Sequence, residues 1–371
     1  MNLTRRGFIG ANLALVLAPA ATLDSWQGVG RIVAVGDVHG DKDALSAVLK
    51  MSGLVDEKEH WIGGAAHLVQ VGDVPARGIQ TRQAFDMLIR LEKEAAVAGG
   101  KVHALIGNHE AGVMSGDLRN ILPGEYSEFA GPDSVRKLER AHAAEATAQT
   151  APGKPELSAD ELERRMGEWR ERHPPGFVEH REAFSPSGYY GSWIRGNNAV
   201  IRINDTLFLH GGISPKFVSR TRASMNGKIQ EELSDPERLL PGTATDVQGP
   251  LWYRGLAEGE EPMLERHLAA VLEFHGVRRI VIGHTVTRSC IRPRFGSRVV
   301  NVDIGLSRFY GLPPACLVIE AASAYVMHRN VTIPLPGRRQ GELLKYLETV
   351  AQADERPSPV RKLIADLALR P

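Results

Sequence analysis

Residues 31–40, with the sequence RIVAVGDVHG, contain the pattern that decides the fold. The apolar run over residues 32–35 is typical of a strand that is buried on both faces. A glycine ends the run, and a carboxylate and an imidazole follow at Asp37 and His39. Taken singly, such residues are usually a cap of the next helix or a hydrogen-bonded structural histidine, so this stretch alone does not establish a ligand site.

The same pattern recurs further along the chain. Apolar runs that end in Asp, Asn or His occur in HLVQVGDVPARG (67–78), VHALIGNHE (102–110), TLFLHGG (206–212) and RRIVIGHT (278–285). Helical periodicity lies between several of these runs, over residues 41–54 and 80–100. Such alternation predicts an α/β core, in which ligands bind at the carboxyl ends of the strands.

The segment from Met114 to Gly188 interrupts this alternation. Residues 132–146 and 158–173 are predicted to be helical, and the second helix opens with a capping-box arrangement. We interpret residues 114–188 as a helical insertion beside the site. It either shapes the access of substrate or only covers apolar surface.

The end of the chain is predicted to add two strands and a helical tail. The strands are expected over residues 315–320 and 324–329, and amphipathic helix from about residue 340 to residue 369. We therefore expect a catalytic domain over residues 30–335 and a C-terminal helical extension over residues 336–371.

The first 21 residues have the layout of a secretory signal. The paired arginines Arg5 and Arg6 precede a short apolar run, and they resemble the twin-arginine signal for the export of folded proteins. Cleavage after Ala20 or Ala21 would give a periplasmic or secreted protein with no stable membrane insertion. The alternatives are a first helix of the fold or an uncleaved anchor, but the run is short for a membrane span.

Composition excludes some partners and covalent frameworks. The chain has 371 residues with 45 Lys and Arg against 44 Asp and Glu, for a formal net charge of +1. Nucleic-acid binders usually carry a basic excess, so no nucleic-acid partner is expected. The two cysteines, Cys290 and Cys316, do not form a disulfide framework, and Cys316 lies in a predicted strand as a core thiol.

Seven polar side chains gather at the predicted strand ends: Asp37, His39, Asp73, Asn108, His109, His210 and His284. Burying so many polar groups without partners would cost several kcal/mol, and two cations would satisfy all of them. Oxygen and imidazole ligands without a thiolate suit Mn, Fe or Zn. The sequence therefore predicts two divalent or trivalent metal ions at this edge of the fold.

The order of these residues suggests their roles. Asp73 lies between the first pair and the later ligands, so it is the natural bridge between two ions. Two metals about 3.5–4 Å apart can hold a hydroxide that attacks phosphorus, and they clamp the phosphoryl oxygens. Arg77 would offer phosphate a planar bidentate fork. His109, beside a metal-bound Asn108, would protonate the departing oxygen.

The motifs GDVHG, GDVPARG, GNHE, HGG and GHT, in this order, resemble those of the calcineurin-like metallophosphoesterases, and within them the phosphoprotein phosphatases. The segments GYYGSWIRGNNAVIRINDTLFLHGGIS and LWYRG resemble the Shewanella-like protein phosphatases, which have a helical insertion before HGG. The resemblance covers residues 31–329. It implies a four-layer αββα sandwich of two mixed β-sheets flanked by helices, with a dinuclear site at the strand ends.

The resemblance also implies how the ligands divide. The first metal would be held by Asp37, His39 and Asp73, and the second by Asp73, Asn108, His210 and His284. Arg77 and Arg254, the latter in GPLWYRG, would bind the phosphate together with Asn108. His109 would be the general acid, and no catalytic role is carried over to Asp303.

One residue departs from the family pattern. Ala76 stands before Arg77, where phosphoprotein phosphatases usually have an aspartate paired with the catalytic histidine. A carboxylate raises the basicity of an imidazole and fixes its tautomer, so His109 is expected to be a poorer acid. The hypothesis that follows is slower turnover of alkyl phosphates than of aryl phosphates.

The expected substrates are phosphorylated proteins or peptides, on Ser/Thr or Tyr, or small phosphomonoesters. One alternative is a nucleotide hydrolase of the diadenosine-polyphosphatase type, which the insertion and LWYRG disfavour. Another is a metal-binding protein with weakened catalysis. Ala76 favours that alternative, and the complete set of ligands with Arg77 argues against it.

Overall fold

The computed structural model describes residues 23–151, 153–154, 157–235, 241–311, 313–321, 323–339 and 341–368. The signal predicted over residues 1–21 lies outside these residues. Within them, no helix combines the length and apolar character that crossing a bilayer requires.

Two mixed β-sheets form the centre of the part of the chain that the structure describes. In the first sheet the strand order is β1 (Ser25–Trp26), β5 (Val200–Ile203), β6 (Thr206–Leu209), β7 (Arg279–Ile282), β9 (Val299–Asn301) and β8 (Arg292–Arg294). In the second it is β12 (Val331–Pro334), β11 (Ser323–His328), β10 (Ala315–Glu320), β2 (Arg31–Val35), β3 (His67–Gln70) and β4 (Lys101–Ala104). The five strands predicted to carry the ligands all form.

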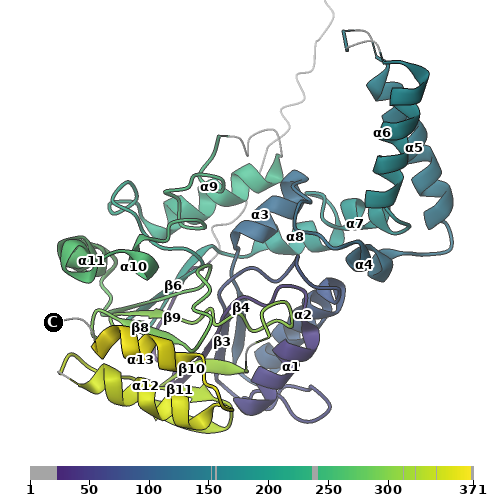
Figure 1. Ribbon diagram of the computed structural model, residues 1–371. Coiled ribbons are helices and arrows are strands. Elements are labelled where there is room, and N and C mark those ends of the chain that lie inside the picture. Colours follow the sequence, from purple (N-terminus) through teal and green to yellow (C-terminus); the bar gives the residue numbers. More distant parts are fainter. Residues whose placement is uncertain are drawn as a thin grey trace, which may run out of the picture.

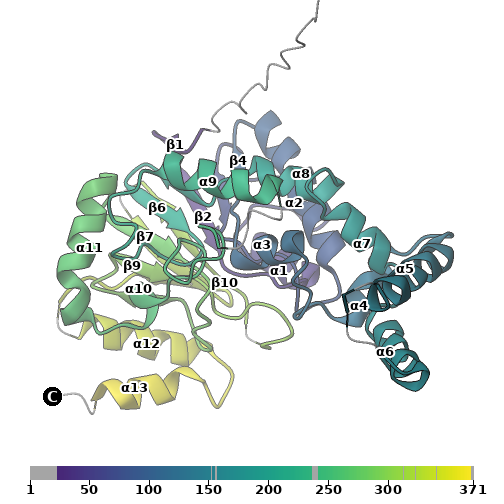
Figure 2. The ribbon, with the colours of Figure 1, turned by 90° about the horizontal axis from the view of Figure 1, so that it is seen from above.

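Helices flank the two sheets (Figures 1 and 2). The crossovers of the second sheet are α1 (Lys42–Met51) and α2 (Thr81–Val97), which match the predicted helical segments. On the side of the first sheet lie α9 (Arg222–Ser234), α10 (Gly255–Glu258) and α11 (Glu261–His275). The predicted α/β fold, two mixed sheets between helices, is confirmed.

The register of the strands explains where the site forms. Strands β2, β3 and β4 run parallel, with Val35 opposite Gln70 and Gln70 opposite Ala104. Strands β6, β7 and β9 also run parallel in the other sheet. Parallel neighbours end at the same edge, so residues that follow these strands meet at one end of the two sheets.

The segment between β4 and β5 is helical. Its elements are α3 (Asn108–Ser115), α4 (Pro123–Tyr126), the 3₁₀ helix η1 (Ser127–Phe129), α5 (Ser134–Gln149), α6 (Ala159–Arg172), α7 (Phe177–Ala183) and α8 (Tyr189–Gly196). The predicted helices over residues 132–146 and 158–173 correspond to α5 and α6, and the Ser158 hydroxyl caps α6 by accepting from the Glu161 amide. Figures 1 and 2 show α5 and α6 as a pair that projects from the body.

The C-terminal region ends in α12 (Glu342–Ala353) and α13 (Val360–Ala368), as the amphipathic pattern predicted. The sequence did not indicate β12, because this strand lies at the edge of its sheet with only Ile333 buried. The domain bounds at residues 30–335 and 336–371, and those of the insertion, stay predictions.

Candidate metal centre

The seven polar side chains predicted at the strand ends converge in the structure. Asp37 follows β2, Asp73 follows β3, and Asn108 and His109 open α3 directly after β4. From the other sheet, His210 follows β6 and His284 follows β7. All seven are buried, between 0% and 7% exposed. We call these seven residues the candidate metal centre.

Asp73 lies at the middle of the candidate metal centre. Its Oδ1 is 3.3 Å from His210 Nε2, and its Oδ2 is 3.8 Å from His109 Nε2 and 4.0 Å from His39 Nε2. Two groups of potential ligand atoms, each within 4.8 Å of one another, therefore share this carboxylate: His39, Asp73 and His109, and Asp73, His210 and His284. This is the arrangement that a bridging carboxylate requires.

The remaining predicted ligands lie close by. Asp37 Oδ2 is 3.8 Å from His39 Nε2, and Asp37 Oδ1 accepts a hydrogen bond from the His284 backbone amide at 3.2 Å. Asn108 Oδ1 is 2.9 Å from His210 Nε2. The structure thus brings all six predicted ligands together. It also places His109, predicted as the acid, within reach of the Asp73 carboxylate.

The backbone at the site is locally strained. His39, Asp73 and His284 have φ angles of 48°, 60° and 65°, in the left-handed region that non-glycine residues rarely adopt. Strain of this kind costs about 1–3 kcal/mol per residue and concentrates at functional sites.

Glycines before the ligands allow the motifs to approach one another. A Cβ on Gly107 would lie 2.4 Å from Asp73 Oδ1, and a Cβ on Gly283 would lie 2.5 Å from Asp37 Oδ1. Both contacts are too short for any side chain. In these two motifs the glycine is therefore required by packing against a carboxylate of another motif.

Buried negative charge accumulates at the site. Burial, together with the carboxylates of Asp303 and Asp73, raises the pKa of Asp37 well above its usual range. Burial also raises the pKa of Asp303, which follows β9, to about 6. For Asp73 burial acts in the same direction, but His210, His109 and His39 outweigh it and hold the pKa well below its usual range. Crowded carboxylates of this kind fit a site for cations.

Two of the candidate ligand imidazoles have the neutral form that binds metals. Burial lowers the pKa of His39 to about 3 and that of His284 to about 2, which keeps both rings neutral. His284 Nε2 and Asp303 Oδ2 are buried without a hydrogen-bond partner. His210 Nδ1 lies 2.9 Å from the Val71 carbonyl oxygen, an outer contact of the kind that orients a ligating histidine. These donor atoms fit a pair of metal ions.

A hollow of about 770 Å³ opens above the candidate metal centre, and Asp73, Asn108, His109 and His284 form part of its lining. Both predicted phosphate-binding arginines, Arg77 and Arg254, also line it. Hydrogen bonds hold the side chains of Arg77 and Arg254 in place.

Arg77 Nη1 lies 2.7 Å from His39 Nε2 and donates to the Tyr310 hydroxyl at 2.7 Å. Arg254 Nη1 donates to the His284 carbonyl oxygen at 2.7 Å and to Thr285 Oγ1 at 3.1 Å. Both guanidinium groups are therefore tied to residues at or next to the candidate ligands.

Ala76 is buried in the wall of this hollow. Burial lowers the pKa of His109, whereas the carboxylates of Asp73 and Asp117 act to raise it. Asp117 lines the same hollow and forms an ion pair with Arg119 at 2.6 Å. The structure therefore identifies a second carboxylate near His109, which the sequence alone did not reveal because Asp117 lies just beyond the recognisable motif.

Two further residues, which the sequence motifs did not assign to the site, support it. The Glu110 carboxylate accepts hydrogen bonds from the amides of Asp73, Val74 and Gly107 at 2.7–2.9 Å, and so joins the second motif to the third. Its presence within GNHE was the available signal. Tyr310 had no such signal, because its loop matches the family pattern only loosely.

Comparison with known proteins agrees with this geometry. Residues 30–288 match the family model for the calcineurin-like phosphoesterases, and the chain belongs to this family. It is a hydrolase of the phosphatase type with a candidate metal centre.

Two relatives show how far the similarity extends. The chain is 27% identical over 286 residues to Shewanella-like protein phosphatase 2 of Arabidopsis thaliana, covering 75% of this chain and 72% of that protein. Among solved structures, the cold-active protein-tyrosine phosphatase of a psychrophilic Shewanella species is 27% identical, with a TM-score of 0.64. That match covers 84% of this chain and 82% of the other.

Proposed function

We propose that the protein is a dinuclear-metal phosphomonoesterase that acts on phosphorylated proteins or peptides. The observation that carries the proposal is the Asp73 carboxylate, shared by two groups of histidines at a hollow whose lining includes Arg77 and Arg254. The names of the similar proteins, a Shewanella-like protein phosphatase and a protein-tyrosine phosphatase, support this class of substrate.

In this proposal the first metal is held by Asp37, His39 and Asp73, and the second by Asp73, Asn108, His210 and His284. Oxygen and imidazole donors suit Mn, Fe or Zn. Two such ions, when bound, supply positive charge for the phosphoryl oxygens and make water a nucleophile at neutral pH.

The side chains around the ions bind and orient the substrate. Arg77 and Arg254 each offer a planar fork to the phosphoryl oxygens, and the Asn108 amide adds a polar contact. His109 Nε2, which faces the hollow beside Asp73, donates a proton to the leaving oxygen. In this proposal the phosphate binds with its leaving group toward His109.

Ala76 bears on which esters are preferred. Without an aspartate at this position, His109 depends on Asp73 and the more distant Asp117 for support. Aryl leaving groups, such as the phenol of phosphotyrosine, need less protonation than alkyl alcohols. We therefore propose a preference for aryl over alkyl phosphates.

The N-terminal pattern of residues 1–21 adds the proposal that this activity is exported to the periplasm or beyond.

The test is hydrolysis of p-nitrophenyl phosphate by the metal-loaded protein, with and without a chelator. We expect the chelator to abolish turnover, Mn²⁺, Fe²⁺ or Zn²⁺ to restore it, and Asp73→Asn to lower kcat more than a hundredfold, since a lost ligand costs at least as much as a lost outer contact. Asp160→Asn, an exposed carboxylate on α6, is the matched control and keeps full activity. Activity that is indifferent to both the chelator and Asp73→Asn would refute the proposal.

A further inference from the structure

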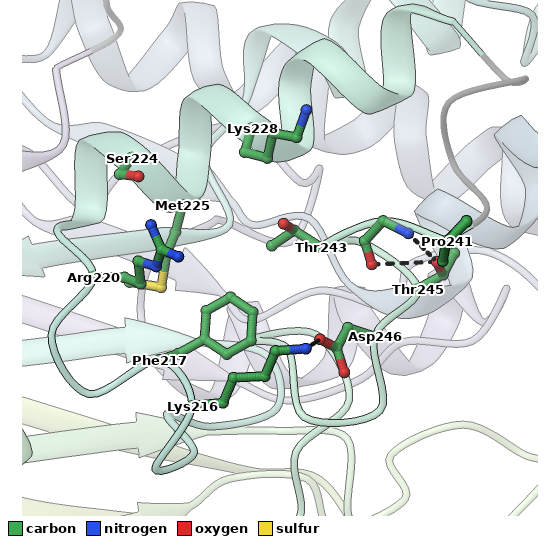
Figure 3. A pocket seen from close by; sticks show the side chains of 11 residues that line it. Lys216, Phe217, Arg220, Ser224, Met225, Lys228, Pro241, Thr243, Thr245 and Asp246 are labelled. Carbon is green, nitrogen blue, oxygen red and sulfur yellow. Dashed lines mark hydrogen bonds and ion pairs between the residues drawn. The ribbon is translucent and has the colours of Figure 1, made fainter.

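A second hollow, of about 700 Å³, shares the lining residue Thr245 with the hollow above the candidate metal centre; Figure 3 shows the side chains that line it. Three described segments line it: the loop that follows β6, the first half of α9, and the loop of residues 241–246. We call it the lateral hollow. None of its lining residues has a role in the proposed reaction.

Cationic side chains dominate the lining of the lateral hollow. It includes Lys216, Arg220 and Lys228 but, among the described residues, a single carboxylate, that of Asp246. Asp246 forms an ion pair with Lys216. Lys228 is paired outside the lining with Glu231, at 3.1 Å. Since two of the three cations have carboxylate partners, the net positive charge of the lateral hollow rests on Arg220.

Arg220 is the cation best placed to bind a ligand. It is exposed, and among the described residues its side chain forms no hydrogen bond or ion pair. Below it, Phe217 and Met225 are buried and give the hollow an apolar floor. An unpaired guanidinium next to apolar side chains suits an acidic residue, because its carboxylate can pair with Arg220 while its methylene groups pack on Phe217 and Met225.

The start of α9 adds to the attraction for anions. The helix begins after Thr221, whose hydroxyl accepts from the Ser224 amide at 3.2 Å, and the Ser224 side chain lines the lateral hollow. The N-terminal end of a helix carries partial positive charge, which favours a nearby anion. The Thr243 side chain adds a hydroxyl on the opposite segment.

The lateral hollow adjoins the catalytic one. Thr245 lines both, and the same loop continues to Trp252 and Arg254, which line the hollow above the candidate metal centre. On the other side, the chain that carries His210 leads within a few residues to Lys216 and Phe217. An extended peptide with its phosphorylated residue at the metal centre can therefore place a flanking residue in the lateral hollow.

We propose that the lateral hollow is a specificity subsite for an acidic residue of the substrate, a carboxylate or a second phosphate that flanks the scissile phosphoester. The inference rests on the proposed function in that it places a phosphopeptide at the metal centre. Arg220 provides the charge that selects the flanking acid, and the start of α9 strengthens the field around it. No residue of the subsite takes part in the bond cleavage.

The first experiment measures binding without catalysis. The probe is a fluorescein-labelled, glutamate-rich peptide without phosphate, titrated by anisotropy against the metal-loaded protein, with inorganic phosphate added to occupy the metal centre. We expect salt-sensitive binding that Arg220→Glu weakens about tenfold, as reversal of one charge at a binding surface can do. Arg170→Glu, an equal charge change on the exposed face of α6, is the control and binds as the wild type does.

Two outcomes of the binding experiment overturn the subsite. One is no binding by the wild type. The other is an equal loss in Arg220→Glu and Arg170→Glu, which would show a response to net charge alone. Both readings hold whatever the catalytic activity of the protein is.

The second experiment measures kcat/KM on two phosphotyrosine peptides that differ only in a flanking Glu or Gln. Arg220→Glu is expected to lower kcat/KM about tenfold on the Glu peptide and to leave the Gln peptide and p-nitrophenyl phosphate unchanged. Equal effects on both peptides would overturn the subsite. If the wild type hydrolyses p-nitrophenyl phosphate but neither peptide, the substrate class in the proposed function is refuted. The binding experiment then still decides whether the subsite exists.

Discussion

Two buried clusters of acids and histidines in this molecule differ in what surrounds them. The candidate metal centre collects residues from both sheets around the Asp73 carboxylate. The second cluster is the pair Glu125 and His180, which we call the arm-root pair. It joins α4 to α7, the helices that flank the projecting α5 and α6, with Glu125 Oε1 3.3 Å from His180 Nε2.

The arm-root pair is part of an apolar layer. His180 is packed against the rings of Tyr126, Phe129 and Phe184, with ring centroids 4.8–5.2 Å apart. Burial raises the pKa of Glu125 to about 8 and lowers that of His180 to about 3, so both groups are neutral at pH 7. The acid and the imidazole are thus in contact and both uncharged, so the arm-root pair does not need a cation to balance it.

The difference shows what distinguishes a metal site from a structural pair. Buried acids and histidines occur in both places. Of the two clusters, only the candidate metal centre combines several carboxylates with several imidazoles, left-handed backbone at the ligands and a hollow with arginines in its wall.

The largest expected effect separates the two clusters directly. His210→Ala removes an imidazole beside Asp73, and we expect kcat on p-nitrophenyl phosphate to fall more than a hundredfold at temperatures where the variant is folded. His180→Ala leaves a cavity among aromatic rings, so Tm is expected to fall while kcat changes less than threefold. Steady-state kinetics and thermal melts of both variants check this. Similar losses of activity in the two variants would contradict the distinction.

A tenfold effect is expected at position 76. Ala76→Asp restores the carboxylate that the family usually has, so His109 becomes a better acid. We expect kcat/KM to rise about tenfold on an alkyl phosphate such as phosphoserine peptide and less than threefold on p-nitrophenyl phosphate. Ala76→Asn, which has nearly the same size without the charge, is the control. Equal effects on the alkyl and aryl esters would count against the hypothesis.

A smaller effect is expected from the loop that carries Tyr310. Its hydroxyl accepts a hydrogen bond from Arg77 Nη1 at 2.7 Å, and Tyr310→Phe removes that contact while keeping the ring. A typical hydrogen bond contributes about 1 kcal/mol net, which corresponds to about a fivefold change. We expect KM to rise by this amount with kcat nearly unchanged. Phe309→Leu, at an exposed neighbouring ring, should change neither constant.

The smallest effect on turnover, and a clear effect on stability, is expected at the arm-root pair. Glu125 keeps its proton in the fold up to about pH 8, whereas an unfolded glutamate ionises near pH 4.5. Its contribution to stability is therefore lost as the pH rises through this range. His180, with its lowered pKa, adds an opposite dependence only below about pH 6.5.

Between pH 6.5 and pH 8 Glu125 therefore acts without His180, and the free energy of unfolding of the wild type should lose about 1.4 kcal/mol per pH unit through this group. Glu125→Gln cannot ionise and should flatten the curve by that amount while keeping kcat. Urea unfolding at pH 6.5, 7.2 and 8 measures the difference between the two proteins. Parallel curves would show that Glu125 does not keep its proton in the fold.

The sequence predicted the strands and the ligands because each motif is local. A short apolar run, a glycine and a polar residue fit within ten residues, and parallel strands bring such ends together. What it could not predict depends on contacts across the fold. The carboxylate of Asp117, which lies just after α3, acts to raise the pKa of His109. The Tyr310 hydroxyl accepts a hydrogen bond from Arg77, which is 233 residues away in the sequence. Strand β12 is mostly exposed and so lacks the apolar pattern of a buried strand.

The central claim is that ends of strands from two sheets hold a pair of metal ions through one shared carboxylate. Elemental analysis by mass spectrometry of the purified wild type and of Asp73→Asn tests it most directly. We predict about two metal ions per chain in the wild type and one or fewer in the variant, with both proteins folded. A wild type without stoichiometric metal after exposure to Mn²⁺, Fe²⁺ and Zn²⁺, or an equal metal content in the variant, would contradict it.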